Sequence, residues 1–187
     1  MLSLSEADRR LLLDLARNSL IAAVSRRELP VFVPQSGILA EARGVFVTIH
    51  CRGRLRGCIG VIEPEEPLGA AVARCAAGAA LHDPRFPPLG EEELADLQIE
   101  ISLLSPLAPL RPEDVKIGLH GLLLSRGSQR GLLLPQVALE HRLGREQFLE
   151  ETCHKAGLPR DAWREPDTKL LGFTCEVFSE GGHGENH

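Results

Sequence analysis

Residues 45–61, VFVTIHCRGRLRGCIGV, contain the pattern that decides the fold. The apolar side chains at positions 45, 47 and 49 alternate with the side chains at 46, 48 and 50. A period of two residues with many β-branched side chains is typical of a β-strand. Arg52-Gly53 has the composition of a tight turn, and residues 54–62 return as the partner strand. The stretch therefore predicts a hairpin in which Cys51 lies opposite Arg54 and Val47 lies opposite Cys58.

The flanking segments predict a mixture of helices and strands. Ser5 can cap a first helix, whose apolar side chains follow helical spacing up to Val24. Further elements are predicted as a helix at 68–81, a rigid proline loop at 83–88, a short acidic helix at 91–96, a strand at 98–104, a hairpin at 122–134, a helix at 136–156 interrupted at Gly144, and a strand at 173–178. The absence of a βαβ rhythm predicts an α+β fold, two-lobed, with mainly antiparallel sheets and flanking helices.

The composition of the 187-residue chain excludes several classes of protein. With 43% hydrophobic and 25% charged residues, the chain can form a core and is not intrinsically disordered. A net charge of -5 disfavours binding to nucleic acid. No apolar run approaches the roughly 18 residues of a membrane span, and the first residues do not resemble a signal peptide. We expect a cytoplasmic protein that binds neither membranes nor nucleic acid.

Cysteine and histidine spacings predict no metal site and no disulfide framework. The five cysteines, an odd number, form no C-x-x-C pair, and no two histidines fall four residues apart on a predicted helix. The phosphate-loop, dinucleotide and nucleophile-elbow motifs are also absent from the sequence. The motifs therefore leave the cofactor unknown.

The segment 55–60, LRGCIG, is the strongest candidate for a functional site. On a regular strand, Arg54, Arg56 and Cys58 share one face. If Arg56 lies within about 4–6 Å of the thiol, the pKa of Cys58 should fall below its usual value of about 8.5, which favours the nucleophilic thiolate. The alternative is that Cys58 is a small buried apolar residue and that the two glycines allow close packing.

The same hexapeptide resembles the signature of the AMME syndrome candidate gene 1 protein family, whose microbial members are called AmmeMemoRadiSam system protein A. One departure is Val61, where the family has a small hydroxylated residue or glycine. The resemblance extends in family order through 83–89 (DPRFPPL), 100–102 (EIS), 121–122 (GL), 130–137 (RGLLLPQV), 153–158 (CHKAGL) and 173–178 (FTCEVF).

The resemblance implies a single AMMECR-type domain over residues 1–187 with two lobes. The larger lobe would comprise about residues 1–106 plus 167–180. The smaller lobe would comprise about residues 107–166 and would contain a three-stranded sheet. Residues 181–187 would form a tail. The hexapeptide side chains would point toward a cleft between the lobes. The candidate ligand-binding residues are then Leu55, Arg56, Gly57, Cys58, Ile59, Gly60, His82, Asp83 and Arg85.

The resemblance leaves two hypotheses for function open. The family is associated with Memo-like and radical SAM proteins, so the chain could be a partner module that binds a protein segment or a large metabolite. Alternatively, it could be a thiol-dependent enzyme in which Cys58 is the nucleophile and Arg56 holds the thiolate or an oxyanion. His82 or Asp83 would then transfer protons, although the sequence places no base beside Cys58.

Overall fold

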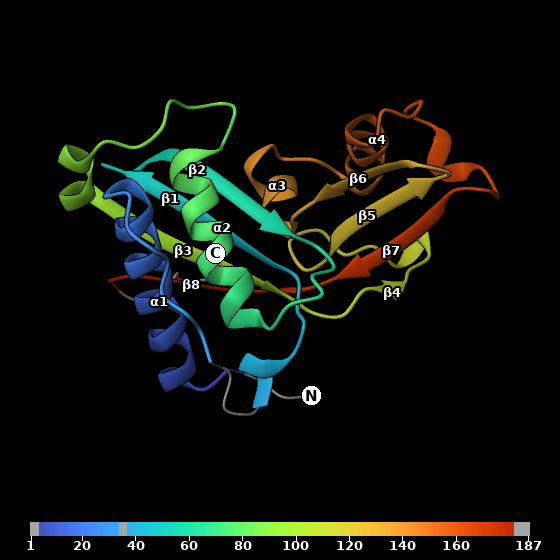
Figure 1. The fold of residues 1–187 in the computed structure, drawn as a ribbon. Coiled ribbons are helices and arrows are strands. Elements are labelled where there is room, and N and C mark those ends of the chain that lie inside the picture. The colour runs from blue at the N-terminus through green and yellow to red at the C-terminus, as the bar shows by residue number, and fades with distance from the viewer. Residues whose placement is uncertain (1–3, 34–36, 182–187) are drawn as a thin grey trace. The chain divides into compact units, whose positions relative to one another are not determined.

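The computed structural model describes residues 4–33 and 37–181, which form two compact units (Figure 1). Unit 1 contains the chain up to Leu104 and again from Glu176, and unit 2 contains Ser105–Cys175. Two connections therefore join the units. Apart from Gly181, the expected tail at 181–187 lies outside the described residues.

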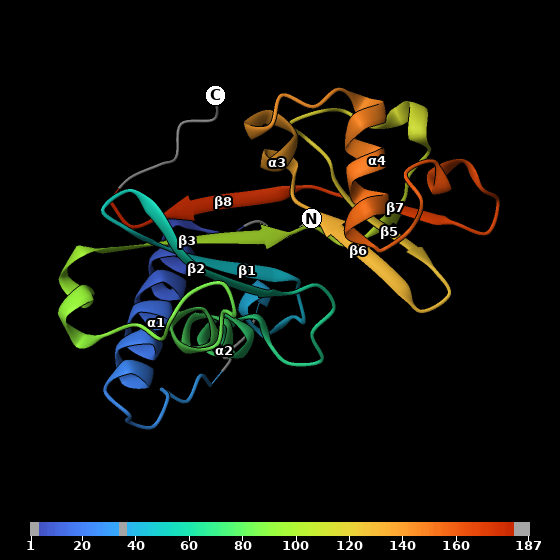
Figure 2. The ribbon, with the colours of Figure 1, turned by 90° about the horizontal axis from the view of Figure 1, so that it is seen from above.

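Unit 1 is a sheet with two helices on one face (Figure 2). The sheet has the strand order β2-β1-β3-β8, and the helices are α1 and α2. Their bounds are β1 Val45–Cys51, β2 Arg54–Val61, β3 Leu97–Leu104, β8 Cys175–Ser179, α1 Glu6–Val24 and α2 Leu68–Leu81. The predicted cap of α1 is confirmed, because the Asp8 amide donates to Ser5 Oγ at 3.1 Å. The 3₁₀ helices η1 and η2 occupy Gly37–Ala40 and Glu91–Asp96.

The core of unit 1 depends on a close approach between α2 and the hairpin. Val45, Val47 and Ile49 are fully buried, as their alternation with polar residues predicts. Most of α2 is alanine and glycine, so its backbone can lie close to β2. A Cβ atom at Gly57 would overlap the carbonyl oxygen of Ala79 in α2. Glycine is therefore required at position 57 for this packing distance.

Unit 2 repeats the combination of a sheet with helices on one face (Figure 2). Its strand order is β4-β7-β5-β6. The elements are β4 Ala108–Pro109, β5 Gly121–Arg126, β6 Gln129–Leu133, β7 Lys169–Phe173, α3 Pro135–Glu140 and α4 Arg145–Lys155, with 3₁₀ helices η3 Pro112–Asp114 and η4 Ala162–Arg164. The expected three-stranded sheet thus gains a fourth strand, because the two residues of β4 pair with β7. The predicted interruption at Gly144 is confirmed, since α3 ends at Glu140 and Gly144 is the N-cap of α4, which begins at Arg145.

The prediction of one strand over 173–178 is wrong. Phe173 ends β7 and pairs with Gly121 of β5, whereas β8 begins at Cys175 in the other sheet. The chain passes from one sheet to the other at Thr174, and a change of sheet leaves no mark in the hydrophobic pattern.

The class of fold is the expected one, with helices and two open sheets whose main pairings are antiparallel. All five cysteines are free. Across residues 4–33 and 37–181, no helix combines the length and the apolar character needed to cross a membrane.

Candidate functional site

A β-bulge at Arg56 determines which side chains of the hexapeptide lie together. Gly57 pairs with Ile49 and Leu55 pairs with His50, so Arg56 is an extra residue in β2. The predicted opposition of Cys58 to Val47 is therefore wrong, because Cys58 pairs with Thr48. A bulge also reverses the alternation of faces beyond it.

The bulge separates residues that a regular strand would place on one face. Arg54 pairs with Cys51, which shares its face with the buried Ile49, whereas Cys58 pairs with Thr48 on the face away from the helices. The expectation that Arg54 and Cys58 share a face is thus incorrect. Leu55 pairs with His50 and does lie on the same face as Cys58.

Arg56 binds Glu93 in η2 through a two-pronged ion pair. Its Nε donates to Glu93 Oε1 at 2.7 Å and its Nη2 donates to Oε2 at 2.9 Å. Arg56 Nη1 also donates to the carbonyl oxygen of Pro87 at 2.9 Å. The hydrogen bond from Arg56 lowers the pKa of Glu93, and burial opposes it. These contacts hold the proline loop and η2 against β2, which is a role in positioning the backbone.

Asp83 is a buried carboxylate that joins the loop after α2 to the hexapeptide. Its Oδ2 accepts hydrogen bonds from the Cys58 amide at 2.8 Å and from Arg85 Nη2 at 2.7 Å. Its Oδ1 accepts from the backbone amide and Nε of Arg85, each at 3.0 Å. The hydrogen bonds from the Arg85 side chain hold the pKa of Asp83 far below its usual range. At neutral pH this carboxylate is ionised and its acceptor positions are occupied.

The thiol of Cys58 lies in a partly buried position beside Thr48, whose Oγ1 is 3.3 Å from the sulfur. Burial raises the pKa of Cys58, and this effect outweighs the lowering by the Thr48 hydrogen bond and the Arg85 charge. The expected lowering of the pKa by Arg56 is therefore wrong. The cation that lowers the pKa is Arg85, and Arg56 is instead bound to Glu93.

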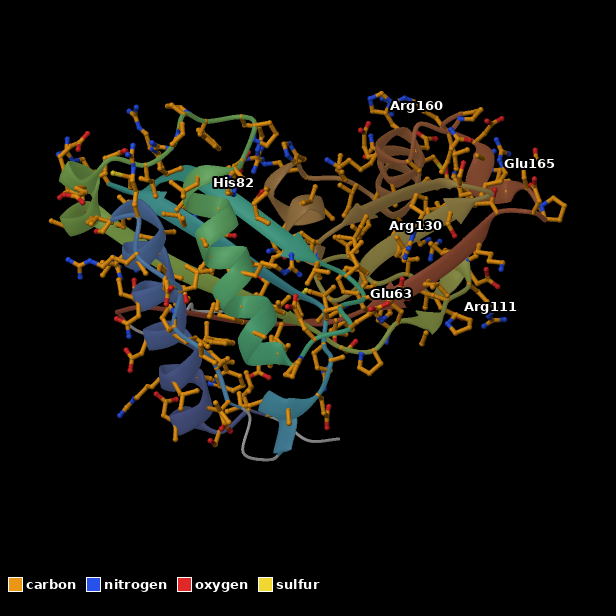
Figure 3. The ribbon with its side chains drawn as sticks, in the orientation of Figure 1. Glu63, His82, Arg111, Arg130, Arg160 and Glu165 are labelled. Atoms are coloured by element: carbon orange, nitrogen blue, oxygen red, sulfur yellow. The ribbon has the colours of Figure 1, made fainter. Side chains whose placement is uncertain are left out.

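The remaining predicted residues divide between core and surface. Gly57 and Ile59 are on the helix-facing side, where Ile59 packs against the core of unit 1. Gly60 contacts the ring of Phe46, which a Cβ atom would overlap. His82 follows the last residue of α2 (Figure 3), and its amide donates to the carbonyl oxygen of Gly78 at 2.7 Å. The predicted set thus contributes Cys58, Asp83 and Arg85 to one hydrogen-bonded group, and Arg56 to a second group with Glu93; the two groups together are called the cluster below.

Two side chains of the candidate site protrude from this cluster. Leu55 is 42% exposed, and the side chain of Arg85 is 54% exposed although its guanidinium binds Asp83. The same guanidinium lies 5.5 Å from the ring centre of Phe86. An apolar side chain and a cation of fixed orientation are therefore available for contact with a partner. The other charged groups of the cluster are already bound within the chain.

Two residues of the cluster were missed from the sequence, Thr48 and Glu93. Thr48 could be found only with the correct strand register, and Glu93 is 37 positions from its partner Arg56. Among the residues that the structure describes, no three histidine, cysteine or acidic side chains gather as metal ligands.

Comparisons with known proteins identify the family of the chain. The family model AMMECR1 matches residues 13–178. The chain belongs to the AMMECR1 family. A protein of Methanothermobacter thermautotrophicus is 42% identical over 96% of this chain and 97% of its own length. A protein of Aquifex aeolicus is 41% identical, over 92% of this chain and 93% of its own.

A solved structure also resembles this family member. The crystal structure of the uncharacterized protein PH0010 from Pyrococcus horikoshii superposes with a TM-score of 0.84 at 39% sequence identity. The match covers 91% of this chain and 90% of the other. The α+β fold is thus shared with that protein.

Proposed function

We propose that this AMMECR1 protein is a binding module that uses the hexapeptide surface to hold a protein segment or a large metabolite. One observation supports this most strongly. Arg56 of the hexapeptide is bound to Glu93, and Asp83, which accepts from the Cys58 amide, is bound to Arg85. Such bonds make a rigid platform, and rigid preformed surfaces lose little entropy on binding.

The exposed groups of the platform define the chemistry of the partner. Leu55 offers an apolar contact, and Arg85 offers a cation whose orientation is fixed by Asp83. Arginine is enriched among the residues that carry most of the binding energy of protein interfaces, and an exposed apolar side chain adds apolar area that binding removes from water. A segment with an apolar side chain next to a carboxylate fits this pair. The association of the family with Memo-like and radical SAM proteins makes those two proteins the first partners to examine.

The thiol-dependent enzyme is the competing hypothesis, and the site chemistry weighs against it. A nucleophilic cysteine needs a lowered pKa or an adjacent base. Burial raises the pKa of Cys58. Asp83, one of the expected proton-transfer groups, stays ionised while it accepts hydrogen bonds from Cys58 and Arg85.

Binding to purified partners tests the proposal. The full chain is immobilised, and the Memo-like and radical SAM proteins of the same genome are passed over it in biolayer interferometry. We expect at least one to bind, and Leu55→Asp to weaken that binding about tenfold, because it places a charge in an apolar contact. Cys58→Ala should bind as the wild type does, because the thiol itself is not required.

A matched variant controls for general effects of the new charge. Val177 in β8, the opposite edge strand of the same sheet, is 40% exposed, close to the value for Leu55. Val177→Asp should leave the affinity unchanged. Loss of binding in Cys58→Ala alone, together with a rate of product formation that depends on Cys58, would favour the enzyme instead.

A further inference from the structure

A hollow in unit 2, lined by residues other than those of the hexapeptide, has an apolar floor. Its volume is about 510 Å³, within the range of roughly 300–1,000 Å³ that small-ligand pockets occupy. Leu133 of β6, Val137 of α3 and Leu143 before α4 line it. These three side chains also pack against a core cluster of unit 2, so the floor is part of the folded core.

The floor is held in place by close packing of α4 on β6. A Cβ atom at Gly131 in β6 would overlap the backbone nitrogen of Ala156, which follows α4. The end of α4 is closed by hydrogen bonds from the amides of Gly157 and Leu158 to carbonyl oxygens of the last turn, each at 2.9 Å. The side of the hollow formed by β6 and α4 is therefore preformed.

The rim of the hollow is basic. His141 follows α3, and His154 and Lys155 are in the last turn of α4. Within the described part of the chain, Lys155 forms no ion pair. All three residues are exposed.

The one acidic side chain that lines the hollow, Glu151, is paired with a cation. Glu151 accepts a hydrogen bond from Arg160 Nη1 at 2.6 Å, which lowers the pKa of Glu151. Figure 3 labels Arg160 beside α4. Arg160 therefore balances the charge of the ionised Glu151, and the Lys155 ammonium leaves the rim with a net positive charge.

A basic last turn also complements the dipole of a helix. That explanation accounts for Lys155 and His154, but it gives no reason for an apolar hollow of ligand size beneath them. A ligand with an apolar body and one negative charge would use both features, because the body would lie on Leu133, Val137 and Leu143. We propose that this hollow binds a small amphipathic carboxylate, such as a short-chain aliphatic acid.

Paired probes test the two parts of the proposal. The full chain, labelled with nitrogen-15, is titrated with hexanoate and separately with hexanol, which has the same alkyl chain without the charge. Hexanoate should bind with a dissociation constant on the order of 1 mM, typical of so few atoms. Its binding should move the amide resonances of Leu133, Val137 and Leu143. Hexanol should bind about tenfold more weakly.

Charge reversal at the rim provides the second test. The double variant His154→Glu with Lys155→Glu changes only exposed side chains, so the fold should persist, and its resonance spectrum checks this. We expect about tenfold weaker hexanoate binding. Lys169→Glu, an exposed lysine of β7 that does not line the hollow, is the matched control and should alter affinity less than twofold. Equal binding of hexanol, equal effects of the two charge reversals, or no saturable hexanoate binding would each overturn the proposal.

Discussion

The contact between β2 and α2 gives opposite predictions for two glycines. In Gly57→Ala, the new methyl group would overlap the carbonyl oxygen of Ala79, a backbone atom that cannot rotate away. Overpacking of this kind costs about 2 kcal/mol of unfolding free energy, because α2 and β2 must separate. At roughly 2–4 °C per kcal/mol for a chain of this size, the melting temperature should fall by about 4–8 °C.

Gly78, on the α2 side of the same contact, is the matched control. A Cβ atom there would lie 3.4 Å from Ile59 Cγ2, an ordinary van der Waals distance. Gly78→Ala should therefore raise the unfolding free energy by about 0.5–1 kcal/mol, since alanine favours a helix over glycine. Urea denaturation followed by circular dichroism measures both variants. Equal effects of the two substitutions, or a Gly57→Ala variant as stable as the wild type, would refute the packing argument.

Three further predictions concern the helix cap, the buried carboxylate and the thiol. Ser5→Ala should lower the unfolding free energy by about 1 kcal/mol, because the cap of α1 is lost, and an unchanged urea midpoint would contradict this. Asp83→Asn should cost about 2 kcal/mol at pH 7. Because folding lowers the pKa of Asp83, the loss of unfolding free energy in Asp83→Asn should be complete above the unfolded pKa of about 4. The loss should shrink as the pH falls below that value, because Asp83 is then protonated in the unfolded chain. A loss that stays constant down to pH 2 would disprove the assignment. Cys58 should react with iodoacetamide at pH 8 more slowly than free cysteine, because its pKa is raised. Thr48→Val should slow the reaction further, because it removes a hydrogen bond that favours the thiolate. A wild-type rate equal to that of free cysteine would exclude a raised pKa.

The sequence was sufficient for features that depend on local patterns. Alternation over 45–51 identified β1, Ser5 identified the start of α1, and Gly144 identified the break between α3 and α4. Each of these signals lies within a few residues of the feature that it predicts. The extra strand β4 and the split at Thr174 depend on pairing with distant strands, so no local pattern contained them.

The chemistry of the candidate site was less predictable than its position. The hexapeptide was correctly identified as a strand with close backbone contacts, because two glycines in a strand indicate them. The bulge at Arg56 moved Cys58 opposite Thr48, and the partner of Arg56 was the distant Glu93. Both outcomes arise from tertiary contacts, and the rise in the pKa of Cys58 comes from burial, which the strand pattern did not show.

The position of β8 has a consequence for protein synthesis. In unit 1 this strand completes the sheet beside β3, and Arg17 of α1 binds Glu180, which follows β8. The ribosome makes α1 and β1–β3 first, then all of unit 2, and only afterwards β8. During that interval the edge of β3 has no neighbour, and an open strand edge can pair with other chains. Unit 2 can fold in this interval, whereas unit 1 must wait for its final strand, so the nascent AMMECR1 chain is most exposed to aggregation while unit 2 is being translated.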